Sequence, residues 1–229
     1  ISVYFYPSNG RPMCGRFSFV MEDSLILERF GVRVRTAIYK ARYNCAPTQN
    51  LAVITGQDRE TLQFFRWGLV PSWSKDLAIG SKLINARAET LAEKPSFRSA
   101  YRSRRCLVPA TGFFEWKRDA LKQPYHIFLK GEEPFCFAGL WEEWAPAGTD
   151  PVRSFTIITT TPNELMQTIH DRMPVILRRE DEERWLASGA DPGLSSLLRP
   201  FPAERMELKP VSNRVNSPSN DGPEVLVVP

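Results

Sequence analysis

Apolar residues in this chain fall mostly into short runs bounded by Gly, Pro, Asn, Asp and Ser. Runs of this length with such boundaries are typical of β-strands. The expected strands lie within residues 50–56, 61–70, 106–118, 123–130, 134–144 and 153–161, and more weakly within 206–215. A turn is expected at 56–60, between the first two runs. Strands are therefore the dominant element of the predicted fold.

Two segments combine helical spacing of apolar residues with a clear stop signal. Residues 22–32 carry acidic residues early and apolar residues at helical intervals, and Gly31 is the expected end of the helix. Residues 179–188 are strongly charged around Trp185 and Leu186, and a helix there is expected to end near Gly189. Both predicted helices are short.

Two further segments are predicted to be helical with less regular patterns. Residues 84–105 are expected to start as a loop and to become helical near Glu89, with Pro95 interrupting the helix. Residues 163–173 suit a helix with Thr161 or Asn163 as its cap. Helices are thus expected at intervals between groups of strands.

The order of these elements predicts an α+β fold. Strands outnumber helices and follow one another directly, which favours a curled, mostly antiparallel, barrel-like core with flanking helices over a parallel βαβ array. No internal repeat or linker is visible, so we expect residues 13–229 to form a single domain. The residues beyond about 217 are rich in Pro, Ser, Asn and Gly and are expected to form a loop-rich tail.

Composition narrows the class of protein. The 229 residues are 42% hydrophobic and carry a net charge of +4, which indicates a globular protein and permits a nucleic-acid partner without requiring one. No apolar run approaches the roughly 20 residues that span a bilayer, and the first residues do not resemble a signal peptide. We therefore expect no membrane association and a cytoplasmic setting with reduced thiols.

The cysteines and histidines do not predict a metal site. The four cysteines are far apart in the sequence and the chain has only two histidines, whereas a zinc site needs clustered ligands. Cys45, Cys106 and Cys136 are flanked by apolar or turn residues and are expected to be small buried side chains. His126, within a strand-like run, is expected to be structural. No metal and no cofactor are expected.

Basic and aromatic residues suggest one candidate interface. Arg98, Arg102, Arg104 and Arg105 lie within eight positions. Further arginines in loop-like segments and two exposed-looking aromatic residues join this set: Arg16, Arg42, Arg87, Trp67 and Trp73. Such a set suits a groove that follows phosphates and stacks bases. The alternative is a solvated charged face with buried tryptophans, and composition alone favours this alternative.

Glu115 is the first candidate for acid–base chemistry. It lies between Phe114 and Trp116, and a carboxyl group desolvated by aromatic rings has a raised pKa suited to proton transfer near neutral pH. Strand alternation leaves a second reading open, because Glu115 could equally face water. The sequence alone does not choose between these two environments.

His170 and Asn85 are weaker candidates when taken singly. His170 is followed by Asp171, and a histidine beside a carboxylate can move protons at physiological pH. A lone histidine is nevertheless more often structural. Asn85 could orient a carbonyl or an amine through its amide, although an asparagine in a loop commonly forms a turn.

The dipeptide Met13–Cys14 raises a different possibility. If Met13 is the translation start and is removed, Cys14 becomes the first residue and carries a free amine and a free thiol. Residues 1–12 would then be a leader that is either a start-site artefact, which we favour, or a segment removed by self-processing. With the leader attached, Cys14 has an amide nitrogen in place of an amine.

Seven segments together resemble the SOS-response-associated peptidase family. They are MCGRF at 13–17, RYNCAP at 42–47, WGLVPSW at 67–73, INARAET at 84–90, RCLVPATGFFEWK at 105–117, HDRMPVIL at 170–177 and VSNRVNS at 211–217. The order of the motifs makes chance similarity improbable. The resemblance implies a β-rich fold and a protein that recognises abasic sites in single-stranded DNA and crosslinks to them.

The resemblance also implies roles for individual residues. The N-terminal cysteine of the family matches Cys14, and its other active-site positions match Asn85, Glu115 and His170. Positions that contact DNA would be Arg16, Pro47, Trp67, Trp73, Arg87 and Thr159. The expected reaction joins the Cys14 amine to the aldehyde of an opened abasic sugar, and the thiol then closes a thiazolidine ring.

Two other functions stay open at this point. Cys14 could be the nucleophile of a cysteine peptidase with His170 as its base, and removal of the leader could be its reaction. The chain could instead be a non-catalytic module that binds single-stranded DNA. Strand-cleaving lyase activity is also conceivable if the imine is not trapped. We expect a monomer that associates with the nucleoid when bound to DNA.

Overall fold

The structure is a computed structural model that describes residues 14–35, 39–189 and 191–228. Its strands are β1 (Phe17–Phe19), β2 (Arg42–Cys45), β3 (Asn50–Thr55), β4 (Gln63–Trp67), β5 (Asn85–Arg87), β6 (Arg105–Ala110), β7 (Gly112–Trp116), β8 (Pro124–Leu129), β9 (Phe135–Trp144), β10 (Val152–Thr160), β11 (Met173–Pro174), β12 (Ile176–Leu177) and β13 (Met206–Pro210). Its α-helices are α1 (Asp23–Phe30), α2 (Arg98–Ser103), α3 (Glu164–Gln167) and α4 (Arg179–Leu186). The expected leader, residues 1–12, lies outside the described residues.

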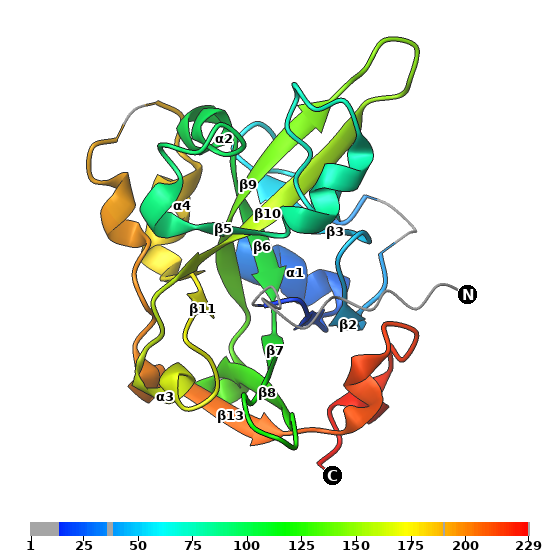
Figure 1. Cartoon of the computed structure of the whole chain (residues 1–229), viewed down its shortest axis with the longest axis vertical. Coiled ribbons are helices and arrows are strands. Elements are labelled where there is room, and N and C mark those ends of the chain that lie inside the picture. The colour runs from blue at the N-terminus through cyan, green and yellow to red at the C-terminus, as the bar shows by residue number, and fades with distance from the viewer. Residues whose placement is uncertain (1–13, 36–38, 190, 229) are drawn as a thin grey trace.

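Five strands close into a barrel. β10 pairs with β4, β4 with β3, β3 with β6, β6 with β9, and β9 pairs again with β10, so the ring has no free edge. The contact of β10 with β4 is parallel and the other four are antiparallel. The predicted α+β class with a curled, mostly antiparallel, barrel-like core is therefore confirmed (Figure 1).

A second sheet continues from the barrel. Its strands are ordered β13, β8, β7, β1 and β2, and β7 follows β6 after the single residue Thr111. Phe17 and Phe113 face each other across β1 and β7 and share the core with Phe137 of the barrel. This packing joins the two sheets into one body. Figure 1 shows the second sheet below the barrel, with α4 and α2 beside the barrel strands.

The first predicted helix and its stop are confirmed. α1 ends at Phe30, and its C-cap is Gly31, whose φ of +71° suits glycine because it lacks a Cβ atom. The predicted helix at 179–188 is α4. The helix predicted for residues 163–173 is too long, because α3 ends at Gln167 and the chain must turn to pair Met173 with Thr160 in β10. Asn163 is its cap, as expected, and accepts from Met166 N.

Three segments are more ordered than the sequence pattern indicates. Residues 42–45 and 85–87 are strands, since each finds a partner strand that is remote in sequence. The loop-rich tail after residue 217 packs against the domain. The Asp221 carboxylate accepts from the backbone N–H groups of Tyr43 and Asn44, both at 2.8 Å, and Val225 is buried.

Candidate functional site

The strand pairing brings Cys14 and Glu115 together. Phe17 lies opposite Phe113 in antiparallel register, and the same register extended by two residues puts Gly15 opposite Glu115. The backbone nitrogen of Cys14 donates to Glu115 Oε1 at 2.5 Å. Cys14 has a φ of +48°, which is unfavourable for a residue with a Cβ atom. Such a strained residue is typical of functional sites.

Glu115 is buried rather than exposed to water. Only 5% of its surface is accessible, and it lies on the same face of β7 as the buried Phe113. Burial raises the pKa of the Glu115 carboxyl to about 7, although the N–H of Cys14 and the nearby Arg118 act to lower it. The reading that Glu115 faces water is therefore wrong. This carboxyl can give or take a proton at neutral pH.

The Cys14 thiol is held in its protonated form. Burial is the main cause that raises the pKa of this thiol, and the negative charge of Glu115 adds to it. Among the described residues no hydrogen bond joins Cys14 to His170. The geometry thus pairs Cys14 with Glu115 and does not form the Cys–His pair of a cysteine peptidase.

Arg118 contacts His170, and its charge also acts on Glu115. The Arg118 guanidinium is 2.8 Å from His170 Nε2 and 2.9 Å from an Asp171 carboxylate oxygen. Burial and the charge of Arg118 lower the pKa of His170. Both Arg118 and Asp171 also influence the pKa of Glu115, so these side chains form one electrostatic group. Sequence reasoning missed Arg118, since nothing distinguishes it from other surface arginines except its position three residues after Glu115.

Asn85 and Arg87 extend from β5 beside β10. Asn85 pairs with Ile157 and Arg87 with Thr159 in a parallel bridge. Neither the nitrogen nor the oxygen of the buried Asn85 amide has a hydrogen-bond partner among the described residues. An unsatisfied buried amide is costly unless something binds to it. The amide is therefore available to a bound group.

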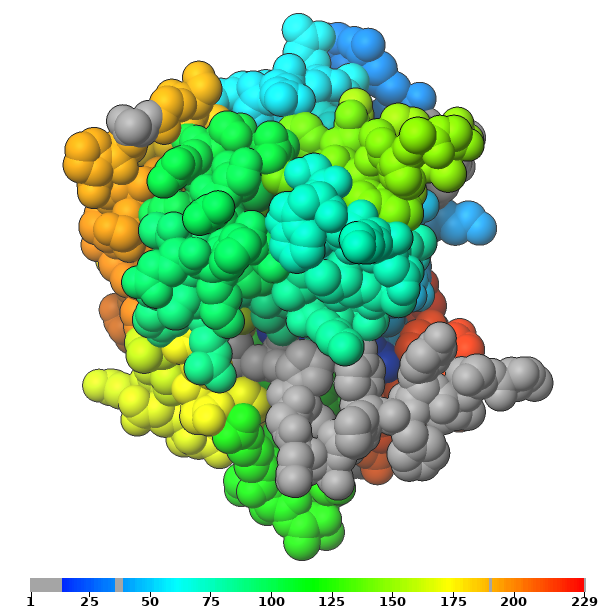
Figure 2. Space-filling model, turned by 45° about the horizontal axis from the view of Figure 1, so that its top comes forward, coloured from blue at the N-terminus to red at the C-terminus, as the bar shows by residue number. Residues whose placement is uncertain are grey.

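Thr159 is hydrogen-bonded to Arg172, which lies two residues after His170. It is buried, and its carbonyl oxygen accepts from Arg172 at 2.8 Å. The Arg172 guanidinium also forms a two-point pair with Glu89, and its backbone N–H lies 3.1 Å from His170 Nδ1. The β5 edge and the loop of His170 are thus connected by one arginine. In Figure 2 the surface of residues from about 70 to 100 (cyan to green) adjoins that of residues from about 160 to 175 (yellow) on one face.

The structure contradicts the expected DNA contact of the Trp67 side chain. The ring has no accessible surface, its Nε1 donates to Ile84 O at 2.9 Å, and it packs against Phe17 and Phe155. Trp67 is a core residue because β4 forms part of the barrel wall. Trp73 differs, with 58% of its surface exposed, and it can stack on a base.

Arg16 is largely engaged within the protein. Its guanidinium donates to Val215 O at 2.6 Å, Asn216 O at 3.1 Å and Asn44 Oδ1 at 3.1 Å, and burial lowers its pKa to about 10. It therefore fastens the C-terminal segment to the second sheet. Pro47 lies half-buried in the turn between β2 and β3.

The arginines of residues 98–105 do not form one free basic face. Arg104 pairs with the buried Glu142, and Arg105 is buried and donates to the carbonyl oxygens of Trp185, Ala187, Tyr101 and Arg102. These two cations hold α2 and α4 against the barrel. Only Arg98 and Arg102 remain exposed, so the interpretation of this run as a phosphate-binding groove is wrong for half of it.

The remaining cysteines and His126 are structural. Cys45, Cys106 and Cys136 are buried free thiols, as expected. His126 is buried between the rings of Phe114 and Phe128, and burial lowers its pKa to about 3. These side chains belong to the core.

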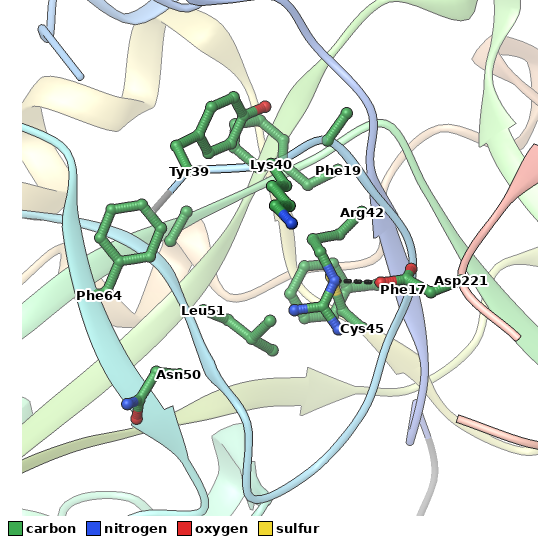
Figure 3. Close-up of a pocket in the computed structure, with 12 residues that line it drawn as sticks. Phe17, Phe19, Tyr39, Lys40, Arg42, Cys45, Asn50, Leu51, Phe64 and Asp221 are labelled. Atoms are coloured by element: carbon green, nitrogen blue, oxygen red, sulfur yellow. Dashed lines mark hydrogen bonds and ion pairs between the residues drawn. The ribbon is translucent and has the colours of Figure 1, made fainter. Parts of the chain in front are cut away.

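A cavity of about 300 Å³ is lined by residues of β1, β2, β3 and β4. Phe19, Tyr39 and Phe64 form its apolar wall, and the ion pair of Arg42 with Asp221 forms a polar wall (Figure 3). None of the four candidate catalytic residues lines it. Over the described ranges no helix is long and apolar enough to cross a membrane. Within the same ranges no three His, Cys, Asp or Glu residues are grouped closely enough to hold a metal ion.

Comparison with known proteins identifies the family. The sequence model described as "SOS response associated peptidase (SRAP)" matches residues 13–218. "Abasic site processing protein YoqW" of Bacillus subtilis is 49% identical over 221 residues, which cover 93% of this chain and 99% of that protein. "Abasic site processing protein HMCES" of Xenopus tropicalis is 32% identical over 221 residues, or 82% of this chain and 66% of that protein.

A solved structure has the same fold. A crystal structure of a protein from Bacteroides thetaiotaomicron superposes with a TM-score of 0.86 at 33% identity and covers 94% of this chain and 100% of that one. The family match, the sequence relatives and this structural similarity cover most of the chain. On these grounds the chain belongs to the SOS response associated peptidase family.

Proposed function

We propose that this protein processes abasic sites in single-stranded DNA by forming a covalent link through Cys14. The observation that carries the proposal is the 2.5 Å contact between Cys14 N and the buried Glu115 carboxyl, whose pKa is about 7. Relatives named as abasic site processing proteins support the choice of substrate. The reaction requires that the peptide bond before Cys14 is cleaved, so that Cys14 carries a free amine.

The link forms in two balanced steps. The Cys14 amine adds to the aldehyde carbon of an opened abasic sugar, and loss of water leaves an imine. The thiol then adds across the C=N bond, so that sulfur bonds to the carbon and the thiol proton goes to the nitrogen. The product is a five-membered thiazolidine. Proximity favours this closure because amine and thiol belong to one residue.

Glu115 moves protons in both steps. Burial raises the pKa of the carboxyl to about 7 while Cys14 carries an amide nitrogen, and a Cys14 ammonium in its place would favour the ionised form. The ionised form removes a proton from the Cys14 ammonium and later from the thiol. The protonated form supplies the proton that leaves with the hydroxyl group as water. The raised pKa of the thiol makes such a base necessary, because little thiolate forms by itself.

Asn85, His170 and the exposed face complete the site. The unpaired amide of Asn85 holds the N-terminal residue or the sugar, and His170 assists ring opening and reversal. Trp73 stacks on an unpaired base and Arg87 binds a phosphate, since both are exposed. The preference for single strands follows from the need for an accessible sugar and unpaired bases.

A denaturing gel tests the proposal. Protein that begins at Cys14 is incubated with a single strand that contains one abasic site, and a covalent adduct is expected as a shifted band. The Cys14→Ala variant is expected to lose the band. The Cys106→Ala variant is the matched control, because Cys106 is also a buried free thiol but lies in β6 of the barrel.

The controls separate this proposal from simple binding. An unchanged adduct in Cys14→Ala would refute a role of Cys14. A non-catalytic binding module predicts equal, salt-sensitive binding of intact and abasic strands and no band that survives denaturation. The same gel reveals lyase activity as a shortened DNA strand.

The position of Glu115 also favours self-processing as a second activity. Water would add to the carbonyl carbon of the preceding peptide bond, the Cys14 nitrogen would be the leaving group, and the adjacent carboxyl can donate a proton to it. Intact mass of the freshly expressed chain tests this activity. Cleavage before Cys14 is expected for the original sequence and its loss for Glu115→Gln, whereas equal cleavage of both proteins would refute the role of Glu115.

A further inference from the structure

Three charged or polar groups compete for the two ring nitrogens of His170. The Arg118 guanidinium is 2.8 Å from Nε2, and Asp171 Oδ1 is 3.0 Å from Nδ1. The backbone N–H of Arg172 also points at Nδ1 from 3.1 Å. His170 itself is only 8% exposed, so these contacts dominate the surroundings of the ring.

The contacts select one tautomer of the ring. Arginine has no acceptor and does not lose its proton, so Nε2 beside Arg118 must offer a lone pair. A neutral ring then carries its proton on Nδ1, and the negative charge of Asp171, whose Oδ1 lies 3.0 Å away, favours a proton there. The Arg172 N–H favours the opposite tautomer, but it is uncharged, and hydrogen bonds to charged groups are about twice as strong as neutral ones. A doubly protonated ring would place two cations side by side.

We propose that Arg118 is a positioning residue for His170: it holds the neutral tautomer with the proton on Nδ1, caps Nε2 in the free protein, and releases Nε2 when a DNA phosphate binds the guanidinium. The release step rests on the proposed function, whereas the tautomer in the free protein does not. Arg118 thereby makes the availability of the histidine depend on the presence of the nucleic-acid strand.

The exposure of the pair allows a phosphate to compete. The Arg118 side chain is 55% exposed and that of Asp171 is 65% exposed. Ion pairs of this exposure contribute only about 0–1 kcal/mol, so little is lost when Arg118 turns to another anion. Arginine also binds phosphate through two parallel hydrogen bonds, which gives the competing contact a favourable geometry.

Other charged groups near His170 do not replace Arg118. The Arg172 guanidinium faces away toward Glu89 and Thr159, and Asp171 is the carboxylate that contacts the ring. Glu115 is coupled to the same two residues, Arg118 and Asp171. Loss of Arg118 is therefore expected to raise the pKa of both the Glu115 carboxyl and the His170 imidazole, because a nearby cation is removed from each.

Nuclear magnetic resonance of the imidazole nitrogens tests the first part. The chain has only two histidines, so loss of one set of signals in His170→Ala assigns the other to His126. In the full chain without DNA, His170 is expected to show a protonated Nδ1 and an unprotonated Nε2 at neutral pH. Arg118→Met is expected to shift the ring toward the other tautomer and to raise the midpoint of its titration. Lys117→Met, which removes a neighbouring cation, is expected to leave both unchanged.

A protonated Nε2 in the original protein, or identical His170 signals in the original protein and Arg118→Met, would overturn the positioning role. Arg118→Lys keeps the charge, so it is expected to restore the titration midpoint while only partly restoring the tautomer. A general loss of dispersion in Arg118→Met would indicate unfolding, and the result for Arg118→Lys would then decide.

An intact single strand without an abasic site tests the release step. Binding is followed by fluorescence anisotropy, and the His170 signals of the saturated protein are expected to approach those of free Arg118→Met. Saturated binding with unchanged His170 signals would overturn the release step. If the strand does not bind at all, the proposed function fails, while the tautomer measured in the free protein still decides the positioning role of Arg118.

Discussion

Glu115→Gln should remove the part of the pH dependence of the unfolding free energy that comes from the Glu115 carboxyl. The carboxyl has its pKa raised from 4.5 to about 7 by burial. A folded-state pKa above the unfolded value means that the folded protein binds this proton more tightly. The stability contribution is therefore largest at low pH and is lost as the pH rises from about 4.5 to about 7.

The size of this loss follows from the shift. Each pKa unit corresponds to about 1.36 kcal/mol, so the full shift costs the folded state about 3.4 kcal/mol at high pH. Most of this loss of stability occurs between pH 5 and pH 8, where the two-state titration formula predicts a change of about 2.5 kcal/mol. Glutamine has no such titration, and its side-chain oxygen can still accept from Cys14 N.

Urea unfolding of the full chain at several pH values from 5 to 8 measures the effect. The free energy of unfolding of Glu115→Gln minus that of the original protein should rise by about 2.5 kcal/mol across this range. Other titrating groups, including His170 and Asp171, contribute to both proteins and largely cancel in the difference. A difference that stays flat from pH 5 to pH 8 would show that Glu115 is not desolvated, and the reasoning about its role would fail.

The other predictions concern binding and packing. Trp73→Ala should weaken binding of an intact single strand by about 1–3 kcal/mol in an anisotropy titration, with unchanged thermal unfolding, because the ring is exposed. Gly112→Ala should destabilise the fold by about 1–3 kcal/mol, since a Cβ would lie 2.1 Å from His126 Nε2. Gly15→Ala, with open space around its Cβ, is the control, and equal melting temperatures would contradict the clash. Asp221→Ala should lower the free energy of urea unfolding by about 3 kcal/mol through loss of its charged hydrogen bonds, whereas a change near zero would mean that the tail is not held there.

Local patterns predicted those elements whose stability is largely local or whose neighbours follow closely in sequence. α1 has its apolar spacing and Gly31, and β3 and β4 form an antiparallel pair across a short turn. β5 has no such signal, because it is only three residues long and exists through pairing with β10. The end of α3 is likewise set by the need of Met173 to reach β10.

The sequence likewise predicted some features of the candidate site and not others. The motifs around Cys14, Glu115 and His170 made these residues candidates through resemblance, and Asn85 came with them. Sequence could not assign the environment of each side chain, since alternation along β7 is compatible with either a buried or an exposed Glu115. It also treated Trp67 and Trp73 alike, although one lies in the barrel wall and the other on the surface.

By itself, the amino-acid sequence determined the α+β class and the strand-rich organisation, because these depend on local periodicity, and its resemblance to a known family supplied the candidate site residues. Only the tertiary structure decided that Cys14 N meets Glu115, that the carboxyl is buried, and that Arg118 contacts His170 while its charge acts on Glu115. These properties depend on strand register and burial, which bring together residues up to 101 positions apart in the case of Cys14 and Glu115. A pKa is set by the neighbours in space, so no pattern along the chain can contain it.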